Sequence, residues 1–135
     1  MRIISLYGHS NCGKSKTLNY LRDLLRAAGK SISKVPHHGD EPETFIYKDM
    51  VICVAPGGDT GEIIRKNIDY FKSKNCDVAI SASRCRGDGP FKLNQFAKGL
   101  GVRIEWYAKS YEYNLSTGTH DLCNKETARF LFGLL

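Results

Sequence analysis

Apolar residues in this chain come in short blocks that alternate with amphipathic stretches. The blocks are rich in β-branched residues and end at glycine, proline or polar residues, which is typical of buried strands. They predict strands in RIISLY (2–7), SISKV (31–35), TFIYKDMVICVAP (44–56), DVAISA (77–82) and VRIEWYA (102–108). The block at 44–56 is interpreted as two strands joined by a tight turn at Lys48 and Asp49, or as one interrupted strand. Its hydrophobic second half predicts a central place in the sheet.

Apolar positions spaced three and four residues apart predict four helices. The first runs from Lys14 to Ala28, and Gly29 follows as a stop signal. The second runs from about Thr60 to Lys74, and the third has Pro90 in its first turn. The fourth is predicted to start at Asn124, which is a favourable capping residue.

The alternation of strands and helices predicts an α/β fold. Parallel strands need crossover connections, and helices in those connections cover both faces of a sheet. We therefore expect a three-layer α/β/α sandwich with a mostly parallel sheet of about five strands. No linker-like segment divides the chain, so residues 1–135 are predicted to form one domain.

The segment GHSNCGKS at residues 8–15 matches the pattern G-x-x-x-x-G-K-[ST] in full. It lies between a predicted strand and a predicted helix, which is the context that phosphate binding requires. Glycines let the backbone wrap closely around phosphate oxygens, and the amide groups at the start of a helix favour an anion. The residues predicted to hold the phosphates are Gly8, His9, Ser10, Asn11, Cys12, Gly13, Lys14, Ser15 and Lys16.

On these residues the chain resembles the P-loop nucleoside triphosphatase and kinase superfamily. The resemblance rests on residues 8–15, and the alternating pattern as far as Ala108 is consistent with the same fold. It implies binding of a nucleoside triphosphate, with ATP favoured, together with Mg²⁺. Lys14 would then reach the β- and γ-phosphates, and Ser15 would ligate the metal.

Asp59 has two interpretations. The superfamily usually places an aspartate at the end of a second hydrophobic strand, where it holds the metal through water. Here Pro56, Gly57 and Gly58 separate Asp59 from the strand that ends at Ala55. Asp59 would then bind the metal and act in catalysis. Alternatively, Asp59 caps the next helix while Glu62 reaches back to it in a capping box.

Arginines follow a later strand, in the loop SRCRGDGP. Ligands of α/β sheets gather at the carboxyl ends of the strands, so Arg84 and Arg86 are placed to face the phosphates. An arginine there would stabilise the charge that develops during phosphoryl transfer. We therefore predict Arg84 as a catalytic residue beside Lys14 and Asp59, with solvated surface arginines as the alternative.

The reaction is left open by the sequence. The segment NKET at 124–127 has threonine where a guanine-specific motif has aspartate, so GTP specificity is not favoured. Hydrolysis of the nucleotide or transfer of its γ-phosphoryl group is expected, and a small nucleotide or nucleoside kinase is one alternative. A nucleotide-dependent switch that acts on a protein or nucleic-acid partner is another, as is a nucleic-acid-binding module with little turnover.

Composition adds a few limits. The net charge of +6 and a pI near 9.1 permit attraction to nucleic acid, but the basic residues are spread along the chain. The five cysteines are scattered and odd in number, which predicts free thiols. No apolar run is long enough to cross a membrane, so a cytoplasmic protein without a membrane partner is expected.

Overall fold

The computed structural model describes residues 1–36, 39–110 and 116–135 of the chain. This part contains six strands and four helices. The strands are β1 (Arg2–Tyr7), β2 (Lys30–Ser31), β3 (Glu43–Tyr47), β4 (Met50–Ala55), β5 (Val78–Ser83) and β6 (Ile104–Ala108). The helices are α1 (Lys14–Ala28), α2 (Gly61–Lys74), α3 (Asp88–Leu100) and α4 (Thr117–Gly133).

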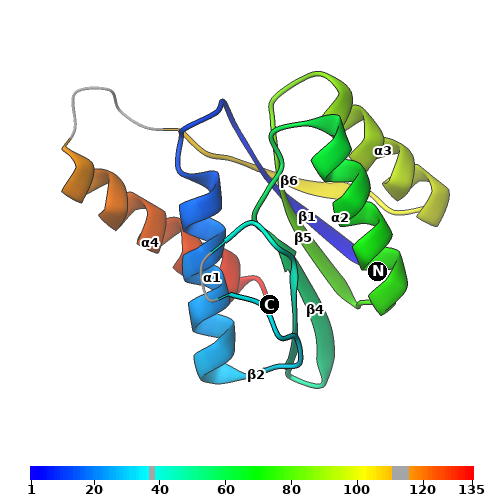
Figure 1. Cartoon of the computed structure of the whole chain (residues 1–135), viewed down its shortest axis with the longest axis horizontal. Coiled ribbons are helices and arrows are strands. Elements are labelled where there is room, and N and C mark those ends of the chain that lie inside the picture. The colour runs from blue at the N-terminus through cyan, green and yellow to red at the C-terminus, as the bar shows by residue number, and fades with distance from the viewer. Residues whose placement is uncertain (37–38, 111–115) are drawn as a thin grey trace.

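The six strands form one mixed sheet in the order β2-β3-β4-β5-β1-β6 (Figure 1). β4, β5, β1 and β6 are parallel neighbours, whereas β2 and β3 add an antiparallel edge. The α/β class is as the sequence predicts, but the sheet has one strand more than expected and is mixed. β3 is antiparallel to β4 because a two-residue turn, which can join only antiparallel strands, connects them.

That turn decides between the two interpretations of residues 44–56. Lys48 and Asp49 both have positive φ values, 51° and 59°, as the two central residues of a tight hairpin turn require. Tyr47 pairs with Met50 immediately beside the turn. The block is therefore two strands, and the second of them, β4, lies between β3 and β5 inside the sheet.

The helices cover both faces of the sheet, which gives three layers (Figure 1). α1 and α4 pack together on one face, where Leu18, Leu21 and Leu25 of α1 are fully buried against the sheet. α2 and α3 pack together on the other face, over a second cluster that includes Ile64 and Phe71. The predicted bounds of α1 are confirmed, and Pro90 lies in the first turn of α3 as expected.

The prediction for the last helix is wrong at its start. α4 begins at Thr117, and the hydroxyl of Ser116 caps it by accepting the amide hydrogen of Thr119 at 3.2 Å. Asn124 lies inside the helix, 1% exposed, and accepts a hydrogen bond from Thr17 of α1 at 3.3 Å. The first turns of α4 carry few apolar residues, so the periodic pattern begins only later in the helix.

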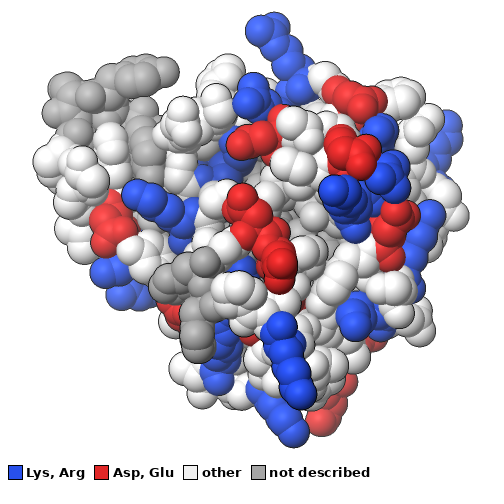
Figure 2. Space-filling model, viewed as in Figure 1, with Lys and Arg blue, Asp and Glu red and all other residues white. Residues whose placement is uncertain are grey.

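The cysteines and the surface agree with the composition. All five cysteines are free thiols, as predicted. No helix in the described ranges is both long and apolar enough to cross a membrane. On the face shown in Figure 2, basic and acidic side chains of the described residues are interspersed rather than separated by sign.

Candidate functional site

The connections that follow β1 and β5 leave a crevice at the carboxyl ends of these two inner strands. The two strands are neighbours, yet β1 leads into α1 on one face and β5 leads into α3 on the other. Adjacent strands that send the chain to opposite faces leave a gap beyond their carboxyl ends, and ligands of α/β proteins bind in such gaps. The predicted loops after β1 and after β5 therefore flank the same position.

The loop of residues 8–13 connects β1 to α1, whose first two residues are Lys14 and Ser15. Its backbone turns sharply, because Asn11 and Gly13 both have left-handed conformations, with φ values of 60° and 92°. α1 begins directly after Gly13, which has no side chain that could accept from the amides of the first turn. Those amide hydrogens are thus left for an anion, in keeping with the general affinity of helix amino termini for phosphate.

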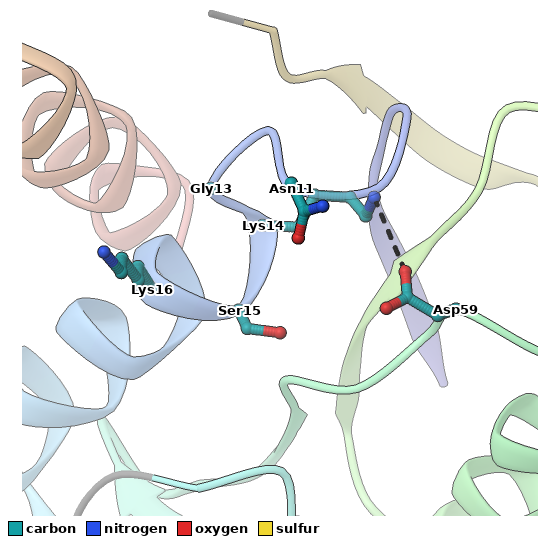
Figure 3. Close-up of a pocket in the computed structure, with 6 residues that line it drawn as sticks. All are labelled: Asn11, Gly13, Lys14, Ser15, Lys16 and Asp59. Atoms are coloured by element: carbon teal, nitrogen blue, oxygen red, sulfur yellow. Dashed lines mark ion pairs between the residues drawn. The ribbon is translucent and has the colours of Figure 1, made fainter. Parts of the chain in front are cut away.

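Lys14 is held inside this loop, with only 5% of its side chain exposed. Its amino group donates hydrogen bonds to the carbonyl oxygens of Gly8 at 2.8 Å and His9 at 2.6 Å. The same amino group lies 3.9 Å from Oδ1 of Asp59 (Figure 3). The charge of Lys14 is therefore fixed in place, and it faces the crevice on the side of Asp59.

Ser15 ties the loop to the neighbouring part of the sheet. Its hydroxyl donates to the carbonyl oxygen of Pro56 at 3.1 Å, and Pro56 directly follows β4. This contact brings the start of α1 close to the segment that carries Asp59. The hydroxyl group of Ser15 and the carboxylate of Asp59 therefore line the same pocket (Figure 3).

Asp59 does not cap α2. The capping residue is Thr60, whose hydroxyl accepts the amide hydrogen of Ile63 at 3.2 Å. Glu62, which was to reach back in a capping box, instead pairs with Arg65 at 2.7 Å. The capping interpretation of Asp59 is therefore wrong, because the next residue already satisfies the helix terminus.

Arg84 is the arginine of the β5–α3 loop that reaches this site. Its Nε lies 3.6 Å from Oδ1 of Asp59, and its side chain is 47% exposed. Asp59 therefore has two cationic neighbours, Lys14 from the loop after β1 and Arg84 from the loop after β5. Arg86 is exposed and has no such ion pair in the described residues, and neither arginine is among the residues that line the pocket itself.

Lys14, Ser15 and Asp59 line a pocket of about 300 Å³, and Arg84 lies next to it through its ion pair with Asp59. The residues that line it are Asn11, Gly13, Lys14, Ser15, Lys16 and Asp59. The side chain of Lys16 points away from Asp59 (Figure 3). It contributes to the lowered pKa of Asp121 in α4, mainly a result of the hydrogen bond from Tyr20 to that carboxylate.

The other predicted loop residues play different parts. Gly8 and His9 supply the carbonyl oxygens that hold Lys14. Cys12 is 7% exposed and packs beneath the loop, close to Gly8, whereas Ser10 is exposed. The pocket is therefore built by the second half of the predicted motif, and the first half supports it.

Asn67 is a supporting residue that the sequence analysis missed. It is 2% exposed, and its side-chain amide donates to the carbonyl oxygen of Gly57 at 2.8 Å and to the hydroxyl of Ser81 at 3.2 Å. It thereby fixes the segment between β4 and Asp59 against α2 and β5. The sequence does contain a sign of this role, because Asn67 is a polar residue at a position where the helical pattern of Ile64, Ile68 and Phe71 predicts an apolar one.

Lys109 is a second residue that the sequence did not reveal. Its backbone amide donates to the carbonyl oxygen of Tyr7 at 2.8 Å, and its side chain is buried behind the loop. Burial lowers the pKa of the Lys109 amine, and the nearby thiols of Cys12 and Cys123 oppose that shift. A buried lysine at the end of an edge strand gives no sequence pattern by which to recognise it.

Three comparisons with known proteins bear on the identity of this site. Neither protein-family models, nor curated proteins, nor solved structures gave a match to the chain. In the described ranges there is also no group of three or more His, Cys, Asp or Glu side chains that could hold a metal ion.

Proposed function

We propose that this protein is a P-loop nucleotide-binding protein that takes up the magnesium complex of ATP or another nucleoside triphosphate. The observation that carries the proposal is the convergence of Lys14, Ser15, Asp59 and Arg84 at the carboxyl end of the sheet. They meet beside a helix amino terminus that has no side-chain cap. Fixed amides, a buried ammonium group and a guanidinium group together suit a polyphosphate.

Two donor atoms of the pocket fit magnesium. This ion prefers oxygen ligands, and proteins often hold it through one or two side chains while phosphate and water complete the shell. Ser15 and Asp59 would supply those side-chain oxygens. The bound ion would neutralise charge on the phosphates.

The side chains then have separate tasks in a phosphoryl transfer. Lys14 would hold the β- and γ-phosphates as a fixed positive charge, since its two carbonyl contacts prevent it from moving freely. Arg84 would stabilise the negative charge that develops on the transferred group. The acceptor is water in the hydrolytic form of the proposal and a second substrate in the phosphotransferase form.

The first test is binding of fluorescent ATP and GTP analogues to the wild type and to Lys14→Ala, with and without magnesium. Removal of the buried ammonium group is expected to weaken binding about ten- to a hundredfold, as loss of a charge-assisted contact to phosphate does. Lys66→Ala, which removes an exposed lysine of α2, serves as the control. Equal binding by the wild type and Lys14→Ala would contradict the proposal.

Turnover separates the two forms of the proposal. Phosphate release by the wild type alone would support hydrolysis, whereas loss of ATP only on addition of nucleosides or nucleotides would support phosphoryl transfer. Arg84→Ala is expected to lower turnover by about a hundredfold or more while binding changes less, because Arg84 acts on charge that develops during the reaction.

A further inference from the structure

The carboxylate of Asp59 lies between two cations. Its Oδ1 atom is 3.9 Å from the Lys14 amine and 3.6 Å from Nε of Arg84. The two cations come from different loops and approach one and the same oxygen. Asp59 is 55% exposed, so its carboxylate stands at the open side of the pocket rather than beneath it.

An anion that contacts both Lys14 and Arg84 must come close to that oxygen. If a terminal phosphate takes this place, as the proposed function requires, its oxygens lie near the Asp59 carboxylate. Two unit charges of the same sign at about 4 Å repel one another even in a solvent-exposed site. Asp59 therefore opposes a metal-free polyphosphate in two ways, by repulsion and by its ion pair with Arg84, whereas Lys14 is already fixed by two carbonyl oxygens.

We propose that Asp59 makes the pocket select the magnesium complex of a triphosphate over the metal-free triphosphate. This inference rests on the proposed function and adds a specificity-determining role for one residue. A triphosphate that carries magnesium has less net negative charge, and a carboxylate is then an acceptable neighbour or a ligand. Without the metal, the Asp59 carboxylate repels the phosphate and competes with it for contact with Arg84.

The proposed selection of the magnesium complex can be assigned to a single residue. Among the residues that line the pocket, Asp59 is the acidic one. The nearby Asp88 is directed to the start of α2, against Gly61, and pairs with Lys92 at 3.1 Å. Because Thr60 caps α2, replacing Asp59 leaves the helix terminus intact. Asp59→Asn therefore removes a charge with almost no change of shape and without loss of a cap.

The experiment compares the wild type, Asp59→Asn and a charge-matched control. Asp69→Asn is the control, since Asp69 is an exposed acid of α2 that pairs with Arg65 outside the pocket. The probes are a fluorescent ATP analogue and inorganic tripolyphosphate, each titrated with excess magnesium and then with EDTA. For Asp59→Asn we expect metal-free binding about five- to tenfold tighter than for the wild type, and a magnesium effect reduced by at least that factor. Asp69→Asn should behave as the wild type.

A second measurement tests the competition for Arg84. Arg84→Ala is made in the wild type and in Asp59→Asn, and EDTA-treated tripolyphosphate is the probe. If Asp59 holds Arg84 away from the phosphate, the loss of affinity is larger in the Asp59→Asn background, by about threefold or more. Arg129→Ala, at an exposed arginine of α4, should cost the same small amount in both backgrounds.

The results of these titrations test the role of Asp59 and the proposed nucleotide binding separately. Metal-free binding that is unchanged or weaker in Asp59→Asn would overturn the inference, while magnesium-dependent binding by the wild type would leave the proposed function in place. Equal tightening in Asp69→Asn would overturn it as well, because net charge alone would then explain the effect. If no probe bound to the wild type, the proposed function and the inference would both fall.

Discussion

Gly8 has no room for a side chain. A Cβ atom at this position would lie 2.3 Å from the backbone oxygen of Lys109 and 2.8 Å from the sulfur of Cys12. The first of these atoms belongs to the backbone at the end of β6, so it cannot turn aside. The glycine is thus required by close packing between two strands' ends, in addition to any need of a bound phosphate.

Gly8→Ala is therefore expected to lower the free energy of unfolding by about 2–3 kcal/mol, as overpacking of a buried position does. It should also weaken nucleotide binding, because the carbonyl oxygen of Gly8 holds Lys14. Urea denaturation measures the first effect. The control is Gly99→Ala in α3, where a Cβ would meet nothing within 4 Å and a gain of up to about 1 kcal/mol is expected.

At this scale the sequence predicted the position of the loop but not its contacts. The spacing of Gly8, Gly13 and Lys14 locates the loop because a short motif needs no long-range information. The ion pairs of Asp59 depend on the distance between two loops that are far apart in the chain, and only the folded sheet sets that distance. The role of Thr60 as a cap was missed because Asp59, beside it, is an equally good capping residue.

Between elements, a buried charge network fastens α1 to β3. Arg22 of α1 is fully buried, and its Nε donates to Glu43 at 2.9 Å. Arg26 and Ser31 also donate to the carboxylate of Glu43. Burial raises the pKa of Glu43, but the hydrogen bonds from Arg26, Ser31 and Arg22 outweigh burial and hold the pKa below its usual value. The helix that carries Lys14 is thus anchored at its far side.

Glu43→Gln should destabilise the protein by about 3 kcal/mol at neutral pH, since it leaves Arg22 buried without its counter-charge. The network also predicts a pH dependence. The folded-state pKa lies below the ordinary 4.5, so the contribution of Glu43 is complete above about pH 4.5 and is lost as the pH falls through the folded-state pKa. Denaturation curves between pH 3 and pH 7 measure it, as a rough window for a carboxyl group.

The wild type should lose stability on acidification more steeply than Glu43→Gln. Glu62→Gln serves as the control, because Glu62 pairs with Arg65 on the exposed face of α2 and its loss should leave no measurable change. Equal acid sensitivity of the wild type and Glu43→Gln would contradict this prediction, because carboxylates other than Glu43 would then account for the loss of stability at low pH.

Element prediction succeeded where one strong local signal was present. α1 has a regular apolar face and a glycine stop, and both of its ends are as predicted. α4 has a weak pattern in its first turns and is held by contact with α1, including the bond between Thr17 and Asn124, so its start could not be found locally. β2 has only two residues and exists because β3 lies beside it.

For the whole molecule, the arrangement of layers follows from the order of elements, whereas the order of strands does not. Helices on both faces are the general outcome of strands alternating with helices. The placement of β5 beside β1, and of β4 beyond it, joins strands that are far apart in the chain, and no short sequence pattern records it. β1 leads into a helix on one face of the sheet and its neighbour β5 into a helix on the other, and this change of face, on which the site depends, was therefore visible only in the structure.

The strand order also determines when the protein can fold during its synthesis. β1 is made first, but both of its neighbours, β5 and β6, belong to the later half of the chain. Gly8 donates its amide hydrogen to Ser83 at 3.1 Å, and Tyr7 accepts one from Lys109, so the loop after β1 takes its shape only when these residues are present. Contacts between distant parts of a chain form slowly.

A nascent chain that ends at Asn75 contains α1, the hairpin and α2, but β1 has no strand to pair with. Such a fragment is expected to show no cooperative unfolding transition by circular dichroism and no affinity for nucleotide, whereas the full chain shows a transition. A cooperative transition in the fragment would contradict this dependence. β1, which is made before the other strands of this domain, is thus among the last of them to reach its final structure.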